Sequence, residues 1–283
     1  MKDGRKKIFV LGSAGMLGND MVRTLVPAYT VVAKDIDAID ITDTHQVADT
    51  LNATKPDVVV NCAAYTDVDA SETHRETAFA VNAEGVRNVA RCCAKVGARL
   101  VHISTDYVFD GTKKEPYTEN DTPHPLNVYG ESKLAGEEYI RAVFNNYVIV
   151  RTSWLFGKNG KNFVKTMLAL AEKQTEISVV NDQRGAPTFT GHLAAGIERI
   201  ITSEETGIFN ITNSGTCSWF EFAQSIFENA GLNHIRVVSI TSEELKRPAP
   251  RPKNSVLDGS KFFDRTGYRM PLWQIGLKEY LGM

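Results

Sequence analysis

The chain of 283 residues is 42% hydrophobic and 23% charged, with a formal net charge of -2, which is the balance of an ordinary globular protein. A near-neutral balance argues against nucleic acid as the main partner, because neutralising phosphates requires a concentrated basic surface. No apolar run approaches the ~18 residues that a membrane span needs, and the four cysteines form no CxxC pair, so we expect a cytoplasmic protein with reduced thiols and no membrane partner.

Strand-like and helix-like segments alternate in the first half of the chain. The apolar patterns predict strands at 8–12, 30–34, 58–60, 99–103 and 147–151, and helices at 16–25, 45–52, 75–96 and 128–142. A βαβα alternation is typical of a parallel sheet covered by helices. We therefore predict the α/β fold class, with a Rossmann-type doubly wound parallel sheet that carries helices on both faces.

The pattern changes in the second half of the chain. Helices are predicted at 163–172, 192–203 and 219–230, and short strands at 177–180, 207–211 and 235–238. The proline-rich segment 247–252 is compatible with neither a helix nor a central strand. We expect residues 1–152 to form a dinucleotide-binding domain and residues 153–283 to form mainly a smaller C-terminal α/β substrate-binding lobe, with some segments returning to the first domain.

A glycine-rich turn stands where the first predicted strand meets the first predicted helix. Gly12, Gly15 and Gly18 have the spacing GxxGxxG. The first glycine permits a tight turn, the second lets backbone N–H groups approach a pyrophosphate, and the third lets the helix pack closely on the strand. The alternative is a turn needed only for packing, since a glycine triplet alone is a weak signal. The predicted cofactor contacts in this turn are Gly12, Ala14, Gly15, Met16, Leu17 and Gly18.

Other cofactor contacts are expected at the ends of the second and third strands. Asp35 is placed to accept hydrogen bonds from the adenosine ribose, which favours NAD, whereas Lys34 is able to pair with a 2′-phosphate. These two signals conflict, so the residues leave NADP and NAD both open. Small residues after the third strand leave room for a dinucleotide at the carboxyl edge of the sheet. The contacts predicted here are Asp35, Asp40, Ile41, Ala63, Ala64 and Tyr65.

The catalytic prediction depends on a tyrosine and a lysine four residues apart. Asn127 is predicted to cap a helix on which Tyr129 and Lys133 share one face. A cation beside the phenol lowers the pKa of the tyrosine toward working pH, as proton exchange with a sugar alcohol or ketone requires. Thr105, just after the strand 99–103, adds a hydroxyl that can hold a carbonyl oxygen. The alternative is an exposed helix face, because this spacing also arises by chance.

Longer motifs carry a family resemblance. They lie at 12–18, 61–64, 104–111, 125–130 and 151–154, and they continue into the second half at 180–188 and 251–255. With these motifs the chain resembles the extended short-chain dehydrogenase/reductase superfamily and, more closely, the dTDP-4-dehydrorhamnose reductase family. The motifs outside the cofactor fold carry the substrate assignment, whereas the glycine turn and the Tyr-Lys pair do not.

The resemblance implies NAD(P)H-dependent reduction of the C4 ketone of dTDP-4-dehydro-L-rhamnose to dTDP-L-rhamnose, a step of cell-surface polysaccharide biosynthesis. NADPH is the expected cofactor, with NADH as the alternative, and no metal is required for catalysis. Tyr129 would donate the proton, Lys133 would tune Tyr129 and hold the nicotinamide ribose, and Thr105 would orient the ketone. Trp154 would flank the sugar, and Asn82 would lie near the cofactor.

The resemblance also implies further substrate contacts. Val68 and Ser104 lie in segments that approach the sugar in this family. Arg184 and Arg251 suit the pyrophosphate of the substrate, because guanidinium groups bind phosphate oxygens as a fork, but either residue is alternatively a loop side chain facing water. Trp154 likewise has the alternative of a core position. The implied substrate set is Val68, Ser104, Thr105, Tyr129, Trp154, Arg184 and Arg251.

Sibling activities share this cofactor fold, so the fold alone does not decide the reaction. Dehydratase relatives place Asp-Glu directly after the threonine, whereas Asp106 is followed here by Tyr107, which argues against dehydration. A nucleotide-sugar epimerase and a non-catalytic regulatory subunit remain as alternatives. We expect a monomer or a homodimer. The magnesium-linked dimer of some relatives is in doubt, because His192 stands where a carboxylate would be expected to join Asp20.

Overall fold

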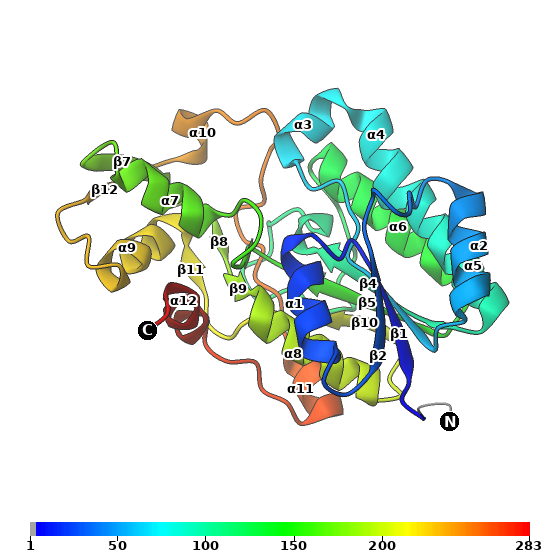
Figure 1. Ribbon diagram of the computed structural model, residues 1–283. Helices are drawn as coiled ribbons and strands as arrows, with labels where there is room; N and C mark the ends of the chain where they lie inside the picture. Colours follow the sequence, from blue (N-terminus) through cyan, green and yellow to red (C-terminus); the bar gives the residue numbers. More distant parts are fainter. Residues whose placement is uncertain (1–3) are drawn as a thin grey trace.

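The computed structural model of the protein describes residues 4–283 and consists of a larger and a smaller lobe (Figure 1). A six-stranded parallel sheet in the order β10-β5-β4-β3-β1-β2 forms the centre of the larger lobe. Its strands are β1 (Lys7–Leu11), β2 (Thr30–Lys34), β3 (Val58–Asn61), β4 (Arg99–Thr105), β5 (Tyr147–Thr152) and β10 (Gly207–Asn210). The predicted Rossmann-type doubly wound sheet is therefore confirmed.

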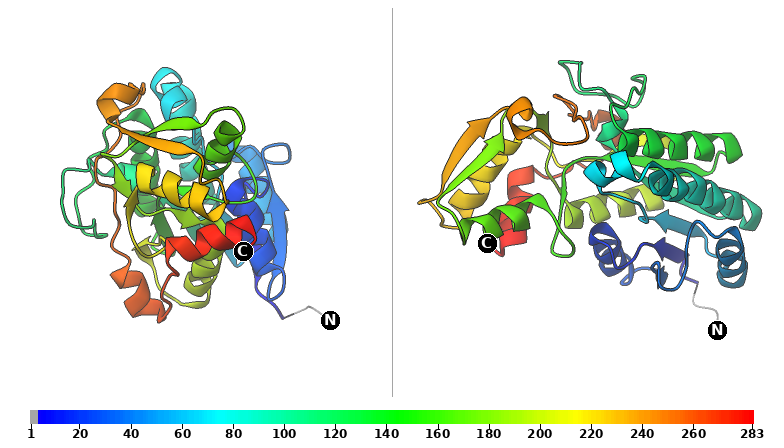
Figure 2. Two further views of the ribbon diagram at one scale, coloured as in Figure 1. Left: turned by 90° about the vertical axis from the view of Figure 1, so that its left-hand side faces the viewer. Right: turned by 90° about the horizontal axis from the view of Figure 1, so that it is seen from above.

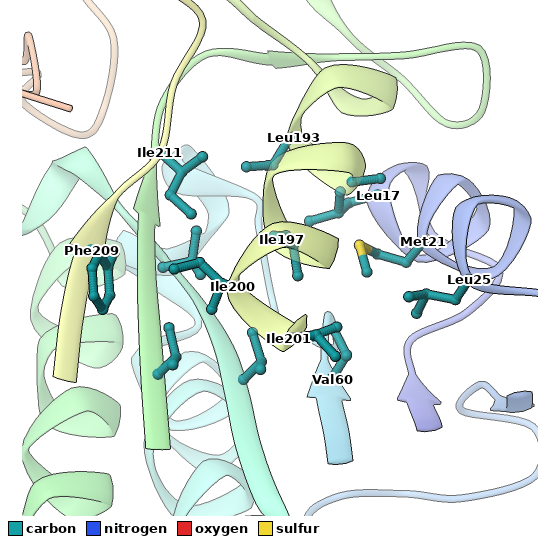
Figure 3. Packing of buried hydrophobic residues seen from close by; sticks show 14 of the residues in the cluster. Leu17, Met21, Leu25, Val60, Leu193, Ile197, Ile200, Ile201, Phe209 and Ile211 are labelled. Atoms are coloured by element: carbon teal, nitrogen blue, oxygen red, sulfur yellow. The ribbon is translucent and has the colours of Figure 1, made fainter. Parts of the chain in front are cut away.

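Helices cover both faces of this sheet. Side chains alternate across each strand, so an all-apolar strand presents an apolar surface on both faces, and each surface must be buried. Ile8 and Val10 of β1 face one cluster of buried apolar residues, and Phe9 and Leu11 face the other. The first cluster is completed by two helices whose side chains meet in Figure 3, α1 (Met16–Leu25) and α8 (Thr190–Thr202). The second cluster is completed by α2 (Thr44–Thr54), α5 (Val86–Val96) and α6 (Val128–Val143).

Segments from the second half of the chain complete the larger lobe. Helix α8 packs along α1 on one face of the sheet, and β10, which follows α8, pairs with β5 at the sheet edge. Phe209 and Ile211, in and just after β10, are buried in the same cluster as the apolar residues of α8. The central sheet is thus built from both halves of the sequence.

The smaller lobe stands beside the larger one, as the view from above shows (Figure 2). Its core is an apolar cluster of its own, centred on Phe156, Phe222 and Trp273. The elements around this cluster are α7 (Phe163–Ala171), β7 (Glu176–Val180), α9 (Trp219–Asn229), β12 (Arg236–Ile240) and α12 (Trp273–Leu281). Two pairs of short strands accompany these elements: β6 (Leu155–Phe156) with β9 (Thr188–Phe189), and β8 (Arg184–Gly185) with β11 (Cys217–Ser218).

The segment predicted as one helix over 75–96 is helical throughout but changes its winding. It consists of α4 (Arg75–Phe79), a π-helical turn η1 (Ala80–Gly85) and α5. Such π turns inside α-helices are frequent at functional sites. The other predicted helices and strands are found within a few residues of their expected ends. The remaining short helices are α3 (Val68–Thr73), η2 (Asp106–Val108), α10 (Ser242–Leu245) and α11 (Ser260–Thr266).

The order of the strands places a crevice at one edge of the sheet. Chain connections run outward in opposite directions from β1, which lies between β2 and β3, and ligands of doubly wound folds bind at this reversal, outside the carboxyl ends of the strands. The proline-rich segment 247–252 is neither helix nor strand, as predicted, and it reaches α3 beside this crevice. Along residues 4–283, no helix combines the length and apolar character that crossing a bilayer requires.

Candidate active site

The glycine turn closes tightly on the end of β3. Gly12 has φ +71°, and an added Cβ would lie 2.7 Å from the backbone nitrogen of Ala63. An added Cβ at Gly18 would collide with the carbonyl oxygen of Gly12, so the start of α1 packs directly on the turn. Glycine is the residue that tolerates both the left-handed φ and the close backbone approach. The turn therefore has the form that a pyrophosphate-binding loop requires.

A cavity of about 300 Å³ lies beside this turn at the carboxyl ends of β1 and β3. The Asp35 carboxylate stands at its edge and accepts a hydrogen bond of 2.7 Å from the backbone N–H of Ala14. The side chain of Asp35 is thereby held at the edge of this cavity. Of the predicted cofactor residues, the cavity brings together Gly12, Gly15, Asp35, Asp40, Ile41, Ala63, Ala64 and Tyr65.

Asn82 supports this cavity from behind. It is fully buried in η1, and its side chain accepts a hydrogen bond from the backbone N–H of Tyr65 and donates one to the carbonyl of Tyr65, both of 2.9 Å. It also donates to the Ser132 hydroxyl at 3.0 Å. The amide of Asn82 thus holds the loop that lines the cofactor cavity.

A second cavity, of about 610 Å³, adjoins the first and shares Gly15, Cys62 and Ala64 with it. We call the first the cofactor cavity and the second the catalytic cavity, after the predicted residues that line them. It lies between the sheet and the smaller lobe. The predicted residues that line it come from both cofactor and substrate sets: Met16, Leu17, Val68, Ser104, Thr105, Tyr129, Lys133 and Trp154. The tertiary structure therefore joins the glycine turn and the Tyr-Lys pair in one continuous site.

Helix α6 carries the tyrosine and the lysine into this cavity. The side chain of Asn127 caps the helix, as predicted, by accepting a hydrogen bond of 2.8 Å from the backbone N–H of Gly130. One turn further on, Lys133 is 2% exposed, and its ammonium donates a hydrogen bond of 2.6 Å to the carbonyl of Ile103. The helix face with Tyr129 and Lys133 is thus part of the interior and is not an exposed surface.

The pKa of Tyr129 differs from the sequence-based expectation. Burial raises the pKa of Tyr129 to about 12, and hydrogen bonding to Thr105 only partly opposes this rise. Burial lowers the pKa of Lys133 to about 8, with Glu137 opposing. The expectation that Lys133 lowers the pKa of the phenol is wrong for this structure, because burial dominates the pKa of Tyr129 and the Lys133 ammonium is bonded to the carbonyl of Ile103. Tyr129 therefore remains a protonated phenol at neutral pH, which is the form that can donate a proton.

Ser104 contributes its hydroxyl to a buried network beneath the cavity. Its Oγ donates a hydrogen bond of 2.5 Å to Oε1 of Glu137. The other carboxylate oxygen of Glu137 lies 2.6 Å from Nη2 of Arg151, and both charged side chains are almost fully buried. The network ties the ends of β4 and β5 to α6, so Ser104 helps to hold the neighbouring Thr105 in place.

The two predicted arginines are not brought into the catalytic cavity. Arg184 is half exposed, and its Nη1 lies 3.8 Å from Oε2 of Glu221. It lines a separate hollow together with Lys253. Arg251 is largely buried beside α3, where its Nη1 lies 2.5 Å from Oδ1 of Asp69. Trp154, by contrast, does line the catalytic cavity.

Several residues of this cavity were not assigned a role from the sequence. Asp106 follows Thr105 directly and is buried, and desolvation raises its pKa to about 7. Its place next to the predicted threonine was a signal that could have found it. Lys161 lies in the loop between β6 and α7, where the sequence has no signal. The unassigned lining residues include Asp106, Tyr107, Thr152, Ser153, Leu155, Gly160 and Lys161.

The two residues considered for a metal-linked dimer have partners within the chain. The Asp20 carboxylate accepts a hydrogen bond of 2.5 Å from Thr190 and pairs with Arg23 at 2.7 Å. Nδ1 of His192 lies 2.8 Å from the side-chain amide nitrogen of Asn213, and Nε2 of His192 lies 3.1 Å from Oε2 of Glu279. Among residues 4–283, no three His, Cys, Asp or Glu side chains form a group that could hold a metal ion.

The fold and the site define a class of protein. A Rossmann sheet with its glycine turn, opening into a cavity that contains Thr105, Tyr129 and Lys133, is the arrangement of the NAD(P)-dependent short-chain dehydrogenases and reductases. Within this class the chain belongs to the RmlD substrate binding domain family, whose sequence profile matches residues 6–283.

Proteins similar to this chain agree with that assignment. The spore coat polysaccharide biosynthesis protein SpsK of Bacillus subtilis is 42% identical over 276 residues, which are 97% of this chain and 96% of the relative. The dTDP-4-dehydrorhamnose reductase of Escherichia coli strain K12 is 38% identical over 97% of this chain and 96% of its own length. The crystal structure of dTDP-4-dehydrorhamnose reductase from Bacillus anthracis, in complex with NADP, has a TM-score of 0.95 and 41% identity, covering 98% and 99% of the two chains.

Proposed function

We propose that the protein reduces the C4 ketone of dTDP-4-dehydro-L-rhamnose to the alcohol of dTDP-L-rhamnose, with NADPH as the reductant. The observation that carries this proposal is the joining of the cofactor cavity to a cavity with Thr105, Tyr129 and Lys133. The family match extends through the smaller lobe, and full-length relatives named dTDP-4-dehydrorhamnose reductase support the choice of substrate. The relative SpsK supports a place in polysaccharide biosynthesis.

The cofactor cavity fits a dinucleotide. The glycine turn leaves no space for a Cβ at Gly12, and the backbone N–H groups at the start of α1 are those that bind a pyrophosphate in this fold. When bound, the nicotinamide supplies a hydride to C4 of the sugar. Asp35 would accept a hydrogen bond from the adenosine ribose, and Lys34, at the end of β2, would pair with a 2′-phosphate. NADPH is supported by the NADP complex of the Bacillus anthracis relative, and NADH is the second cofactor to test.

The side chains of the chain then provide the proton. The phenol of Tyr129 gives its proton to the ketone oxygen as the hydride arrives, so that the C=O double bond becomes C–H and O–H and the tyrosinate remains. The Thr105 hydroxyl, which faces Tyr129, orients the ketone by hydrogen bonding to its oxygen. Lys133, buried at the wall of the catalytic cavity, would hold the nicotinamide ribose and stabilise the tyrosinate that forms after proton transfer.

The substrate is expected to extend from this point toward the smaller lobe. Val68 and Trp154 line the cavity and would flank the sugar. Arg184 and Arg251 are proposed to meet the pyrophosphate, which for Arg251 requires exchange of its bond to Asp69 for one to phosphate. We also propose a cytoplasmic protein, which agrees with its four free cysteines, acting as a monomer or a homodimer.

The test is the loss of reduced-nicotinamide absorbance with NADPH and NADH in parallel. The substrate is generated from dTDP-4-dehydro-6-deoxy-D-glucose by a separate 3,5-epimerase, and reactions without the epimerase are the control. We expect oxidation that depends on the epimerase. Cofactor binding without oxidation would contradict the proposal and would favour a nucleotide-sugar epimerase or a non-catalytic regulatory subunit, which isomerisation assays would distinguish.

A further inference from the structure

Two tryptophans that lie far apart in the sequence stack face to face next to the catalytic cavity. The rings of Trp154 and Trp219 have centroids 3.6 Å apart and planes inclined by 7°. Trp154 lines the cavity, whereas Trp219 belongs to α9 of the smaller lobe and also packs against Phe163, with ring centroids 4.5 Å apart. Trp219 therefore acts on the cavity through Trp154.

Trp154 needs such support because its backbone is strained. Its φ is +48°, in the left-handed region that a bulky side chain rarely adopts, and such strain persists only where surrounding contacts hold the residue. Its carbonyl accepts a hydrogen bond of 3.1 Å from Thr188. Its indole lies so close to Gly185 that an added Cβ there would collide with the ring. The indole thus contacts both the backbone of Gly185 and the ring of Trp219.

Trp219 is itself held firmly. It is the first residue of α9, and Ser218 before it forms a capping box with Glu221. The backbone N–H of Glu221 donates to the Ser218 hydroxyl at 3.1 Å, and the backbone N–H of Ser218 donates to the Glu221 carboxylate at 2.7 Å. Such a box fixes the entry of the chain into the helix. The smaller lobe can therefore set the orientation of an indole that belongs to the catalytic cavity.

We infer that Trp219 is a positioning residue for the sugar. By holding the Trp154 indole in one orientation, it sets the wall against which a hexose ring packs, since an indole offers an apolar surface with one N–H donor. The inference relies on the proposed function, because it takes the hexose of a nucleotide sugar as the occupant of the cavity. Trp219 does not touch the reacting atoms, so its effect should fall on substrate binding.

Kinetics of Trp219→Ala and Trp219→Phe test the inference, with Trp273→Phe as the matched control from the core of the same lobe. In Trp219→Ala we expect the KM for the dTDP-sugar to rise about tenfold, the scale of a lost aromatic pair, while kcat changes by less than about threefold. The Kd of NADPH should stay unchanged, and Trp219→Phe should recover most of the loss. An unchanged KM in Trp219→Ala, or an equal loss of NADPH binding, would overturn the inference.

Circular dichroism tests the stack without any turnover. Two indoles in face-to-face contact couple their excited states, so the contribution of each to the far-ultraviolet spectrum depends on the other. We expect the spectral changes of Trp154→Phe and Trp219→Phe to be non-additive in the double variant, whereas those of Trp219→Phe and Trp273→Phe should add. Additive changes in both pairs would overturn the inference. Non-additive changes in a protein without turnover would contradict the proposed function and leave the stack itself confirmed.

Discussion

Arg251 and Asp69 attach the proline-rich segment 247–252 to α3 beside the catalytic cavity, with Nη1 of Arg251 lying 2.5 Å from Oδ1 of Asp69. Asp69 belongs to α3 and follows Val68, which lines the cavity, while Arg251 belongs to the proline-rich segment 247–252. The Asp69 carboxylate also accepts a hydrogen bond of 3.2 Å from the backbone N–H of Ala249. One carboxylate thus anchors the segment through which the chain returns from the smaller lobe to α11 in the larger lobe.

Replacing Arg251 by alanine should weaken substrate binding. The anchored segment loses its charge-assisted bond, and the proposed contact to the pyrophosphate is lost with it. We expect the KM for the dTDP-sugar to rise at least tenfold, in keeping with about 2 kcal/mol for truncating a partly buried ion-paired group, with the Kd of NADPH unchanged. Arg265→Ala, which removes an exposed arginine 3.8 Å from Glu205, is the control. Equal KM values in the two variants would contradict this role.

Tyr129→Phe should remove turnover while leaving cofactor binding intact. The ring keeps its packing, but the proton of the phenol is lost, so we expect kcat to fall by about 10² to 10⁴. The control is Tyr139→Phe on the same helix, whose hydroxyl bonds Glu84 away from the cavity. Stopped-flow absorbance gives kcat, and quenching of intrinsic fluorescence gives the Kd of NADPH. A Tyr129→Phe variant with wild-type kcat would exclude Tyr129 as the proton donor.

Lys133→Met should abolish turnover but increase stability at neutral pH. The pKa of Lys133 is about 8 in the folded protein against 10.5 for the free side chain. Between these pH values the unfolded chain binds more protons, so the free energy of unfolding of the wild type rises as the pH increases through this window. At pH 7 the buried charge therefore costs on the order of 3 kcal/mol, which methionine does not incur. Urea titrations over this pH range measure the difference, and a variant less stable than wild type at pH 7 contradicts the prediction.

Asp106→Asn should change the pH dependence of stability on the acid side, between about pH 4 and pH 7. The pKa of Asp106 is about 7 in the folded protein against 3.8 for the free side chain. The folded protein binds more protons between these values, so this contribution to the free energy of unfolding is present at low pH and is lost as the pH rises toward 7. Asparagine carries no such titration, and the variant should lose this part of the slope. Asp264→Asn, on the exposed side of α11, is the control and should keep the wild-type slope.

Gly12→Ala should impair cofactor binding beyond the cost of backbone strain. Gly97 has almost the same φ, +75° against +71° for Gly12, but an added Cβ at Gly97 meets no described atom within 4 Å. Gly97→Ala therefore measures the strain alone, about 1 to 2 kcal/mol. Gly12→Ala adds a collision with Ala63 at the floor of the cofactor cavity. We expect only Gly12→Ala to weaken NADPH binding, by fluorescence titration, and equal effects of both variants would contradict this account.

Features decided by neighbouring residues could be predicted from the sequence. Alternating apolar segments predicted the strands of the sheet, since a buried parallel strand must be apolar on both faces. The glycine spacing predicted the turn at Gly12, and the i,i+4 spacing predicted the shared face of Tyr129 and Lys133. Asn127 was predicted as a cap because capping depends on a local hydrogen bond to Gly130. The family motifs added the substrate class, which these local rules do not contain.

Only the tertiary structure decided which groups meet and how they ionise. Tyr129 was expected to have a lowered pKa, but the burial that raises it depends on elements remote in the chain. The same is true of Arg251, which bonds Asp69, and of Trp154, which stacks on Trp219. The spacing of residues in the sequence does not predict such contacts, because they join elements that lie far apart in the chain. The sequence by itself thus determined the local frame of the site, and desolvation and long-range packing determined its charges and its walls.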